Sequence, residues 1–322
     1  MHGGGPFRIL FLLILIGGLL PSGGAAERRF ERTLPLAPGG RVILDTYRGS
    51  ITVEEGETAD VRLTAEIGID AATPAEADQV FAAVQLAAEA APGVVTITAR
   101  NPRDSRARFI WHDKLQVDLA FRLTVPRGST LDLRTINGAI AVGNFTGHVK
   151  ARAENGAITF RRIDGSIDAA TQFGDIIVSR CLGPVNARVL RGLIRTGTIG
   201  GPSTLKNTSG DIEVMMARGP LDGYAEAGDL IVGFPHTIAG PADLVTSGGN
   251  LRVSIDPLAA CEVRASSRWG RVASKLPLAV TDGATGTRRL TGRLNAGGPT
   301  LSLHADGGQV RIDPGETLFE GS

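Results

Sequence analysis

The chain has 322 residues and a formal net charge of +1, with 34 lysine and arginine residues against 33 acidic residues. This balance excludes the large basic field with which many nucleic-acid-binding domains hold phosphate backbones. Glycine is abundant at 43 residues, whereas aromatic residues make up only 5% of the chain. The composition predicts a folded protein with many tight bends and few large rings in its core.

Residues 1–26 have the layout of a secretory signal peptide. An apolar run over 7–20 carries one positive charge, Arg8, near its start, and P-S-G-G-A-A follows with small residues suited to cleavage after Ala25 or Ala26. The run is short for a membrane span, although an uncleaved anchor is an open alternative. We expect an exported protein in the periplasm, on the cell surface or outside the cell, with no stable membrane span after cleavage.

A β-rich segment with one helix is expected over 27–135. The letters T-P-A-E from Thr73 are typical of a helix start. Apolar residues at helical spacing continue to Ala88, and Pro92-Gly93 follows, which predicts a helix near 74–91. Alternating residues predict strands over 94–99 and 115–125. We expect the helix to pack across an antiparallel sheet and to close the N-terminal end of the fold.

Repeats occupy residues 136–313. Eleven glycines recur at a spacing of nine from Gly138 to Gly228, and an aliphatic residue stands two positions after every second one. Apolar and mixed residues then alternate, which predicts a strand with one buried face. The unit is therefore 18 residues long, with two strands and a glycine at each bend. The aliphatic positions are Ile140, Ile158, Ile176, Ile194, Ile212 and Leu230.

Such a unit cannot bury its apolar face alone, so the units must stack. The predicted fold is all-β: a single-stranded β-solenoid, similar to a β-helix, with coils of about 18 residues and two strands per coil. Gly249 and Gly270 each follow the preceding repeat glycine by 21 residues, and Gly308 follows 38 residues later, or about two turns. The segment 288–295 and the tail over 314–322 are expected to cover the far end.

Three passages carry a resemblance to a known family. They are G-S-I-T-V from Gly49, V-P-R-G-S-T-L-D-L-R-T-I-N-G-A-I from Val125, and the G-x-I-x-V units that follow. Over most of residues 30–315 the chain resembles the bacterial exported proteins known as putative adhesins. The resemblance implies a β-solenoid at the envelope or cell surface, and it brings no catalytic motif.

No sequence motif indicates a catalytic residue, a metal site or a cofactor. Phosphate loops, serine nucleophile turns and metal-binding histidine spacings do not occur. Aspartate follows a repeat glycine only at Asp175, Asp211 and Asp229, too seldom for a calcium-binding nonapeptide array. We therefore expect no enzyme. The alternative is a carbohydrate-active β-helix enzyme, a lyase or hydrolase acting on an envelope or extracellular polysaccharide. Such an enzyme needs paired carboxylates, and two groups lie close together in the sequence: Asp164 with Asp168, and Asp222 with Glu226 and Asp229.

One segment combines arginine with aromatic residues: R-N-P-R-D-S-R-A-R-F-I-W-H-D-K, from Arg100 to Lys114. This combination suits contacts with an anionic glycan, a lipid headgroup or a protein, although an ordinary solvated loop gives the same pattern. The candidate ligand-binding residues are Arg103, Arg106, Arg108, Trp111 and His112, with Trp269 as a second candidate. The leading hypothesis is a non-enzymatic, adhesin-like binding surface or scaffold. Its partner would be an envelope glycan or protein and not nucleic acid, and its oligomeric state is open.

Overall fold

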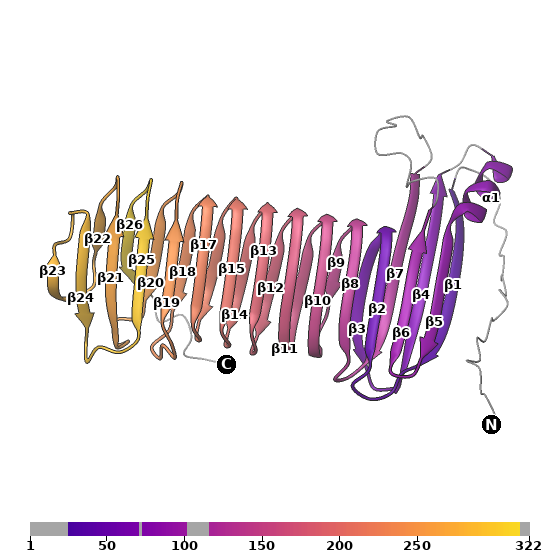
Figure 1. Cartoon of the computed structure of the whole chain (residues 1–322), viewed down its shortest axis with the longest axis horizontal. Coiled ribbons are helices and arrows are strands. Elements are labelled where there is room, and N and C mark those ends of the chain that lie inside the picture. Colours follow the sequence, from indigo (N-terminus) through magenta and orange to yellow (C-terminus); the bar gives the residue numbers. More distant parts are fainter. Residues whose placement is uncertain (1–24, 71–72, 102–115, 316–322) are drawn as a thin grey trace, which may run out of the picture.

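The computed structural model describes residues 25–70, 73–101 and 116–315. These residues form an elongated stack of strands, with the N-terminal strands and the helix at one end (Figure 1). Within the described ranges, 26 strands join in one hydrogen-bonded and mostly parallel network, and the helix is single. The all-β prediction is therefore confirmed.

The strands pair in two rows. The repeat glycines lie where the chain passes from one row to the other, and two of them, Gly147 and Gly165, fall inside the strands β10 and β11. The first half of β11 belongs to row two and its second half to row one. Row one contains β2 (Arg41–Arg48), β8 (Thr130–Asn137), β10 (Phe145–Asn155), β11 (Ile158–Phe173), β13 (Val185–Arg191), β15 (Ser203–Ser209), β17 (Leu221–Ala227) and β19 (Ala242–Thr246). Row two contains β3 (Ser50–Gly56), β9 (Ile140–Val142), β11, β12 (Ile176–Cys181), β14 (Ile194–Ile199), β16 (Ile212–Ala217), β18 (Leu230–Phe234) and β20 (Leu251–Ile255).

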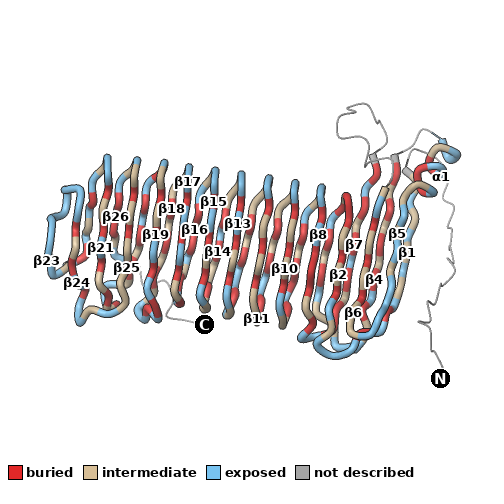
Figure 2. The backbone as a smooth tube through the Cα atoms, in the orientation of Figure 1, coloured by how far each residue is buried: buried red, intermediate tan, exposed pale blue. Residues whose placement is uncertain are grey.

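Residues 18 apart lie side by side through the middle of the stack. In row one Val149 pairs with Ile167, and Ile167 pairs with Val185. Side chains alternate between the two faces of a strand, so this register lines up buried residues with buried residues. The inward side chains of both rows form one hydrophobic core, and buried and more exposed positions alternate along most strands (Figure 2).

Close approach between successive coils explains why glycine recurs at the bends. Gly192 has a φ of +143°, and a Cβ built on it would overlap the carbonyl oxygen of Gly174 in the preceding coil. No L side chain fits there without separating the two coils. The glycine spacing is therefore a direct consequence of stacking.

Further strands extend both rows at the N-terminal end, in each row first by a parallel pairing and then by antiparallel ones. Row two continues through β7 (Gln116–Pro126), β4 (Asp60–Asp70) and β1 (Ala25–Pro35), and row one continues through β6 (Val94–Arg100) and β5 (Gln85–Ala91). The helix α1 (Pro74–Ala83) packs against this end. Arg28 of β1 forms a 2.6 Å ion pair with Asp78 and lies 4.2 Å from the ring centroid of Phe81.

The helix is shorter than the sequence predicts. Thr73 caps its start, since its hydroxyl accepts a 3.2 Å hydrogen bond from the backbone N–H of Glu76. The predicted extension to residue 91 is wrong, because α1 ends at Ala83 and β5 begins at Gln85. The alanine-rich stretch has high helix propensity, but pairing with β6 satisfies the backbone groups of that strand. The strands predicted over 94–99 and 115–125 are confirmed as β6 and β7.

The C-terminal coils are not stacked in chain order. The strand β25 (Thr300–Ala305) lies between β19 and β21 (Cys261–Ser267), and β26 (Val310–Pro314) lies between β20 and β22 (Val272–Ser274). The coil of Gly308 is thus inserted between those of Gly249 and Gly270, and not about two turns beyond, as its spacing predicts. Its apolar side chains complete the core columns in that gap, and sequence separation alone cannot reveal this order.

The far end of the stack is closed by a hairpin. The strand β24 (Arg289–Leu294) pairs antiparallel with β21, and β23 (Ala279–Gly283) pairs antiparallel with β24. The loop between them covers the edge of β22: the N–H of Val272 donates to the carbonyl of Thr287 at 2.7 Å, and the N–H of Gly286 donates to the carbonyl of Val272 at 2.7 Å. These bonds protect an edge strand that would otherwise expose its backbone groups.

Candidate functional site: a basic column on the outer face of row one

A line of cationic side chains crosses the outer face of row one. It occupies the position four residues before every second repeat glycine, from Gly138 to Gly210, and strand register places these residues side by side. We call Arg134, Arg152, Arg188 and Lys206 the basic column; Ala170 stands between its second and third members. Neighbouring positions are separated by one strand spacing, about 4.8 Å.

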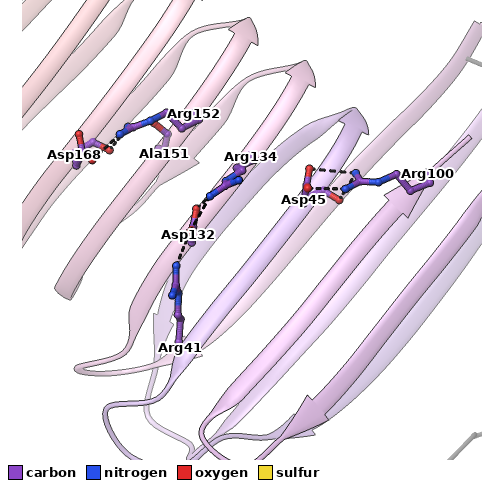
Figure 3. Close-up of polar contacts among 8 residues, drawn as sticks. All are labelled: Arg41, Asp45, Arg100, Asp132, Arg134, Ala151, Arg152 and Asp168. Carbon is purple, nitrogen blue, oxygen red and sulfur yellow. Dashed lines mark hydrogen bonds and ion pairs between the residues drawn. The ribbon is translucent and has the colours of Figure 1, made fainter. Parts of the chain in front are cut away.

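The N-terminal half of this face is held by ion pairs (Figure 3). Arg134 Nε lies 3.1 Å from Asp132 Oδ1, and Arg41 Nη2 lies 2.6 Å from Asp132 Oδ2. Nearby, Arg100 Nη2 lies 2.5 Å from Asp45 Oδ2. Burial by itself would raise the pKa of Asp132, but the hydrogen bonds from Arg134 and Arg41 hold that pKa below its ordinary value. The carboxylate of Asp132 therefore stays ionised and orients both guanidinium groups.

Arg152 is fixed in the same way by the adjacent strand. Its Nη2 donates to Asp168 Oδ2 at 2.6 Å, and its Nη1 donates to the carbonyl oxygens of Asp168 at 2.8 Å and Ala151 at 3.1 Å (Figure 3). Asn186 donates to the other oxygen of Asp168 at 3.1 Å. Because these hydrogen bonds hold its guanidinium group, the Arg152 side chain is fixed in one orientation.

The C-terminal half of the basic column lacks such partners. Arg188 and Lys206 are both exposed, and neither forms an ion pair with another residue in the described part of the chain. Their charges are therefore compensated only by solvent and counter-ions. An external anion should therefore be stabilised more strongly at Arg188 and Lys206 than at the arginines that already have acidic partners.

An open hollow of about 520 Å³ lies over Ala170. The short side chain of Ala170 leaves room between Arg152 and Arg188, and Ile136 and Leu190, each 43% exposed, also line the hollow. Its volume is typical of small-ligand sites. Cationic and apolar side chains thus converge on one accessible place, which the carboxylates of Asp45 and Glu154 also line.

A second hollow of about 560 Å³ lies near the N-terminal end of row two. Its lining includes the carboxylates of Glu27, Glu66 and Asp118 and a single arginine, Arg48. It has no counterpart to the basic column, so the hollow over Ala170 is the better candidate for binding.

The residues predicted from the sequence are not those of the basic column. Five of them, Arg103, Arg106, Arg108, Trp111 and His112, lie outside the described residues. Trp269 is 69% exposed at the bend between β21 and β22, where its ring centroid lies 5.6 Å from the Arg268 guanidinium. It does not line the hollow. The basic column was missed because its members are 18 residues apart, although aligning the repeats on their glycines brings them into one line.

The aspartates that follow repeat glycines have a structural role. A side-chain oxygen of Asp175, Asp211 and Asp229 accepts a backbone hydrogen bond of 2.7–2.8 Å from the next coil: from Leu193, Asp229 and Asn250 respectively. These bonds satisfy N–H groups at the bends. In the described ranges, no group of three or more histidine, cysteine, aspartate or glutamate residues is placed to hold a metal ion.

Both cysteines are buried and unpaired. Burial raises the pKa of both thiols, that of Cys261 to about 11. A buried thiol of high pKa is a poor nucleophile, so neither cysteine belongs to a reactive site.

Comparisons with known proteins find similarity to solved structures. No family model and no curated protein matches the chain. A protein from Bacteroides fragilis, described as a putative adhesin, is 11% identical, with a TM-score of 0.42 and coverage of 92% of this chain and 100% of its own. A Parabacteroides distasonis protein described as a putative lipid-binding protein is 11% identical, with a TM-score of 0.41 and coverage of 89% and 97%. A Clostridium sporogenes cell adhesion protein, also described as putative, is 8% identical, with a TM-score of 0.26 and coverage of 90% and 100%.

Because the sequence identities are only 8–11%, the adhesin and lipid-binding descriptions apply to those proteins and are not transferred to this chain. The chain is similar to solved bacterial structures that bear the adhesin description, over most of their length and its own. Among the described residues, no helix combines the length and apolar character needed to cross a bilayer.

Proposed function

We propose that the protein is an exported, non-enzymatic β-solenoid that presents the outer face of row one as an adhesin-like binding surface or scaffold of the cell envelope. The observation that carries the proposal is the basic column beside the hollow over Ala170. The partner would be an envelope glycan or protein, and the location periplasmic, surface or extracellular. Residues 1–26 would be the signal peptide that leads to export.

The rigidity of the face supports binding without catalysis. Arg134 and Arg152 are oriented by Asp132 and Asp168 before any ligand arrives, and the strands beneath them are paired on both sides. A preorganised surface loses little conformational entropy when it binds. Two of the carboxylates named for the enzyme alternative have other partners: Asp164 lies 3.4 Å from Arg162, and Asp168 binds Arg152.

In domain terms, we propose that 27–135 is an N-terminal β-rich segment with its capping helix, that 136–313 carries the repeats, and that 314–322 is a tail. The segment with Arg103, Arg106, Arg108, Trp111 and His112, and separately Trp269, remain secondary candidates for ligand contact.

Binding of purified protein to isolated envelope fractions and to a glycan panel tests the proposal. We expect the double variant Arg188→Gln/Lys206→Gln to lose binding. The matched control, Arg180→Gln/Arg252→Gln, removes two exposed arginines of row two that form no ion pair among the described residues, and it should bind as the wild type does. Equal binding by the row-one double variant would overturn the assignment of this face.

Two further readouts separate the remaining hypotheses. Loss of binding in Arg106→Ala or Trp111→Ala would support the segment predicted from the sequence as part of the surface. Release of reducing ends or unsaturated sugars from a bound polysaccharide would contradict a non-enzymatic function and support the lyase or hydrolase alternative.

A further inference from the structure

We propose that the ligand of row one is an acidic polysaccharide that lies along the long axis of the molecule, across the strands, with its carboxylates on the basic column. This inference rests on the proposed function, because it uses the same face. It adds the chemical class of the ligand, its direction and the length that is bound.

The spacing of the basic column favours a saccharide chain. Its positions follow successive strands at about 4.8 Å, which is close to the rise of one pyranose residue in an extended polysaccharide. From Arg134 to Lys206 the line covers five strands in register, β8, β10, β11, β13 and β15. This distance is about 19 Å. A polysaccharide laid along it would keep one ring over each strand.

The gap at Ala170 provides a seat for one carboxylate. Arg152 and Arg188 stand on either side, two strand spacings or about 9.6 Å apart. Because Arg188 has no ion-pair partner among the described residues, its planar guanidinium is free to form two parallel hydrogen bonds with a carboxylate. Lys206 supplies a second, less directional charge for the next acidic group along the chain.

Apolar side chains beside the basic column favour sugars over a bare polyanion. Ile136 and Leu190 line the hollow, and each is 43% exposed. The C–H face of a pyranose ring packs on aliphatic and aromatic side chains, whereas a polyphosphate offers no such surface.

Acidic residues mark the end of the bound stretch. Asp222 and Asp243 are both exposed, and they lie side by side on β17 and β19, directly beyond the strand of Lys206. They repel a second acidic segment. The structure therefore assigns a binding stretch of about five sugar residues, one for each of the strands β8 to β15.

Calorimetric titration of the full-length protein with oligogalacturonates of increasing length tests the inference. Affinity should rise until the oligosaccharide reaches about five residues and then level off, and added salt should weaken it. A neutral oligosaccharide of equal length should not bind. The variant Ala170→Glu places a carboxylate in the gap between Arg152 and Arg188. We expect the affinity for the oligogalacturonate to fall at least about tenfold, because the new carboxylate competes with the ligand for these arginines.

The matched control is Ala141→Glu, which places the same charge at a half-buried outward alanine of row two and should bind as the wild type does. Arg188→Gln alters an exposed side chain and provides the same test if Ala170→Glu does not fold. Polyphosphate that competes as well as the oligogalacturonate would overturn the assignment of a saccharide.

The outcomes also separate this inference from the proposed function. If envelope material binds and depends on Arg188 and Lys206, but no oligogalacturonate binds, the ligand class is wrong and the binding face stands. If neither kind of binding depends on these two residues, both proposals are wrong.

Discussion

The inward and outward sides of row one follow different rules, although they belong to the same strands. The inward column carries alanine in three successive strands, all fully buried: Ala151, Ala169 and Ala187. One residue later, the outward column carries arginine, alanine and arginine at Arg152, Ala170 and Arg188. Packing between coils fixes the size and polarity of the inward residues, whereas solvent places no such limit on the outward ones. Specific chemistry is therefore to be found on the outer face.

The largest contrast is expected on one strand, β11. Phe160 is fully buried, and its truncation to alanine should lower the free energy of unfolding by about 3–5 kcal/mol, because it leaves a cavity in a core that cannot collapse. The adjacent outward substitution, Thr159→Ala, should change it by less than about 0.5 kcal/mol. Urea unfolding followed by circular dichroism measures both. Equal losses would contradict the division into an inward and an outward side.

The bends should be almost as sensitive as the core. Gly192→Ala places a methyl group against the Gly174 carbonyl at a positive φ, and we expect a loss of about 3 kcal/mol. The control is Gly68→Ala in β4, where the nearest atom to an added Cβ lies at 3.9 Å. A stable Gly192→Ala protein would mean that successive coils are not in close contact at the bends.

A smaller effect is expected at Asp132, which is buried beneath the outer face. Replacing it with asparagine should cost about 1–2 kcal/mol at neutral pH, because Arg41 and Arg134 lose a charged acceptor. The pKa of Asp132 is lowered in the folded state, so its stabilisation is complete above the unfolded-state pKa of about 3.9 and disappears as the pH falls through the folded-state pKa.

Thermal unfolding of the wild type and Asp132→Asn from pH 7 to pH 2 checks this dependence. The two curves should converge only below about pH 3.9. Convergence at a higher pH would show that the carboxylate is not stabilised by its arginines.

The smallest effect on stability is expected for Arg188→Gln/Lys206→Gln, since both side chains are exposed and unpaired among the described residues. The free energy of unfolding should change by less than about 0.5 kcal/mol, while ligand binding is lost. Circular dichroism melting beside the binding assay measures both. A marked loss of stability would mean that these cations support the fold and not the ligand.

The middle of the fold could be predicted because stacked units repeat the same pattern of residues in the sequence. Gly138 to Gly228, with an aliphatic residue two positions after every second glycine, predicted the strands and the 18-residue register that the pairings show. The ends could not be predicted as well. The stretch from Gln85 has high helix propensity, but it forms a strand that pairs with β6. The coil of Gly308 does not follow chain order, because its strand β25 pairs with β19 and fills the core beside it.

The candidate site was present in the sequence but not as a continuous motif. Arg134, Arg152, Arg188 and Lys206 become neighbours only when the repeats are aligned, whereas the run of arginines from Arg103 to Arg108 is adjacent in the chain. Strand register, which brings residues 18 positions apart together, is thus the information needed to locate a surface on a repeat protein.

Lysine acetylation with and without bound ligand tests the central claim most directly. Lys206 lies in the basic column of row one, and Lys275 follows β22 at the end of row two, where it pairs with Asp313 at 3.2 Å and is 64% exposed. With a binding envelope fraction at saturation, mass spectrometry should show protection of Lys206 and unchanged labelling of Lys275. Protection of Lys275 alone, or of neither lysine while the ligand is bound, would contradict binding at the outer face of row one.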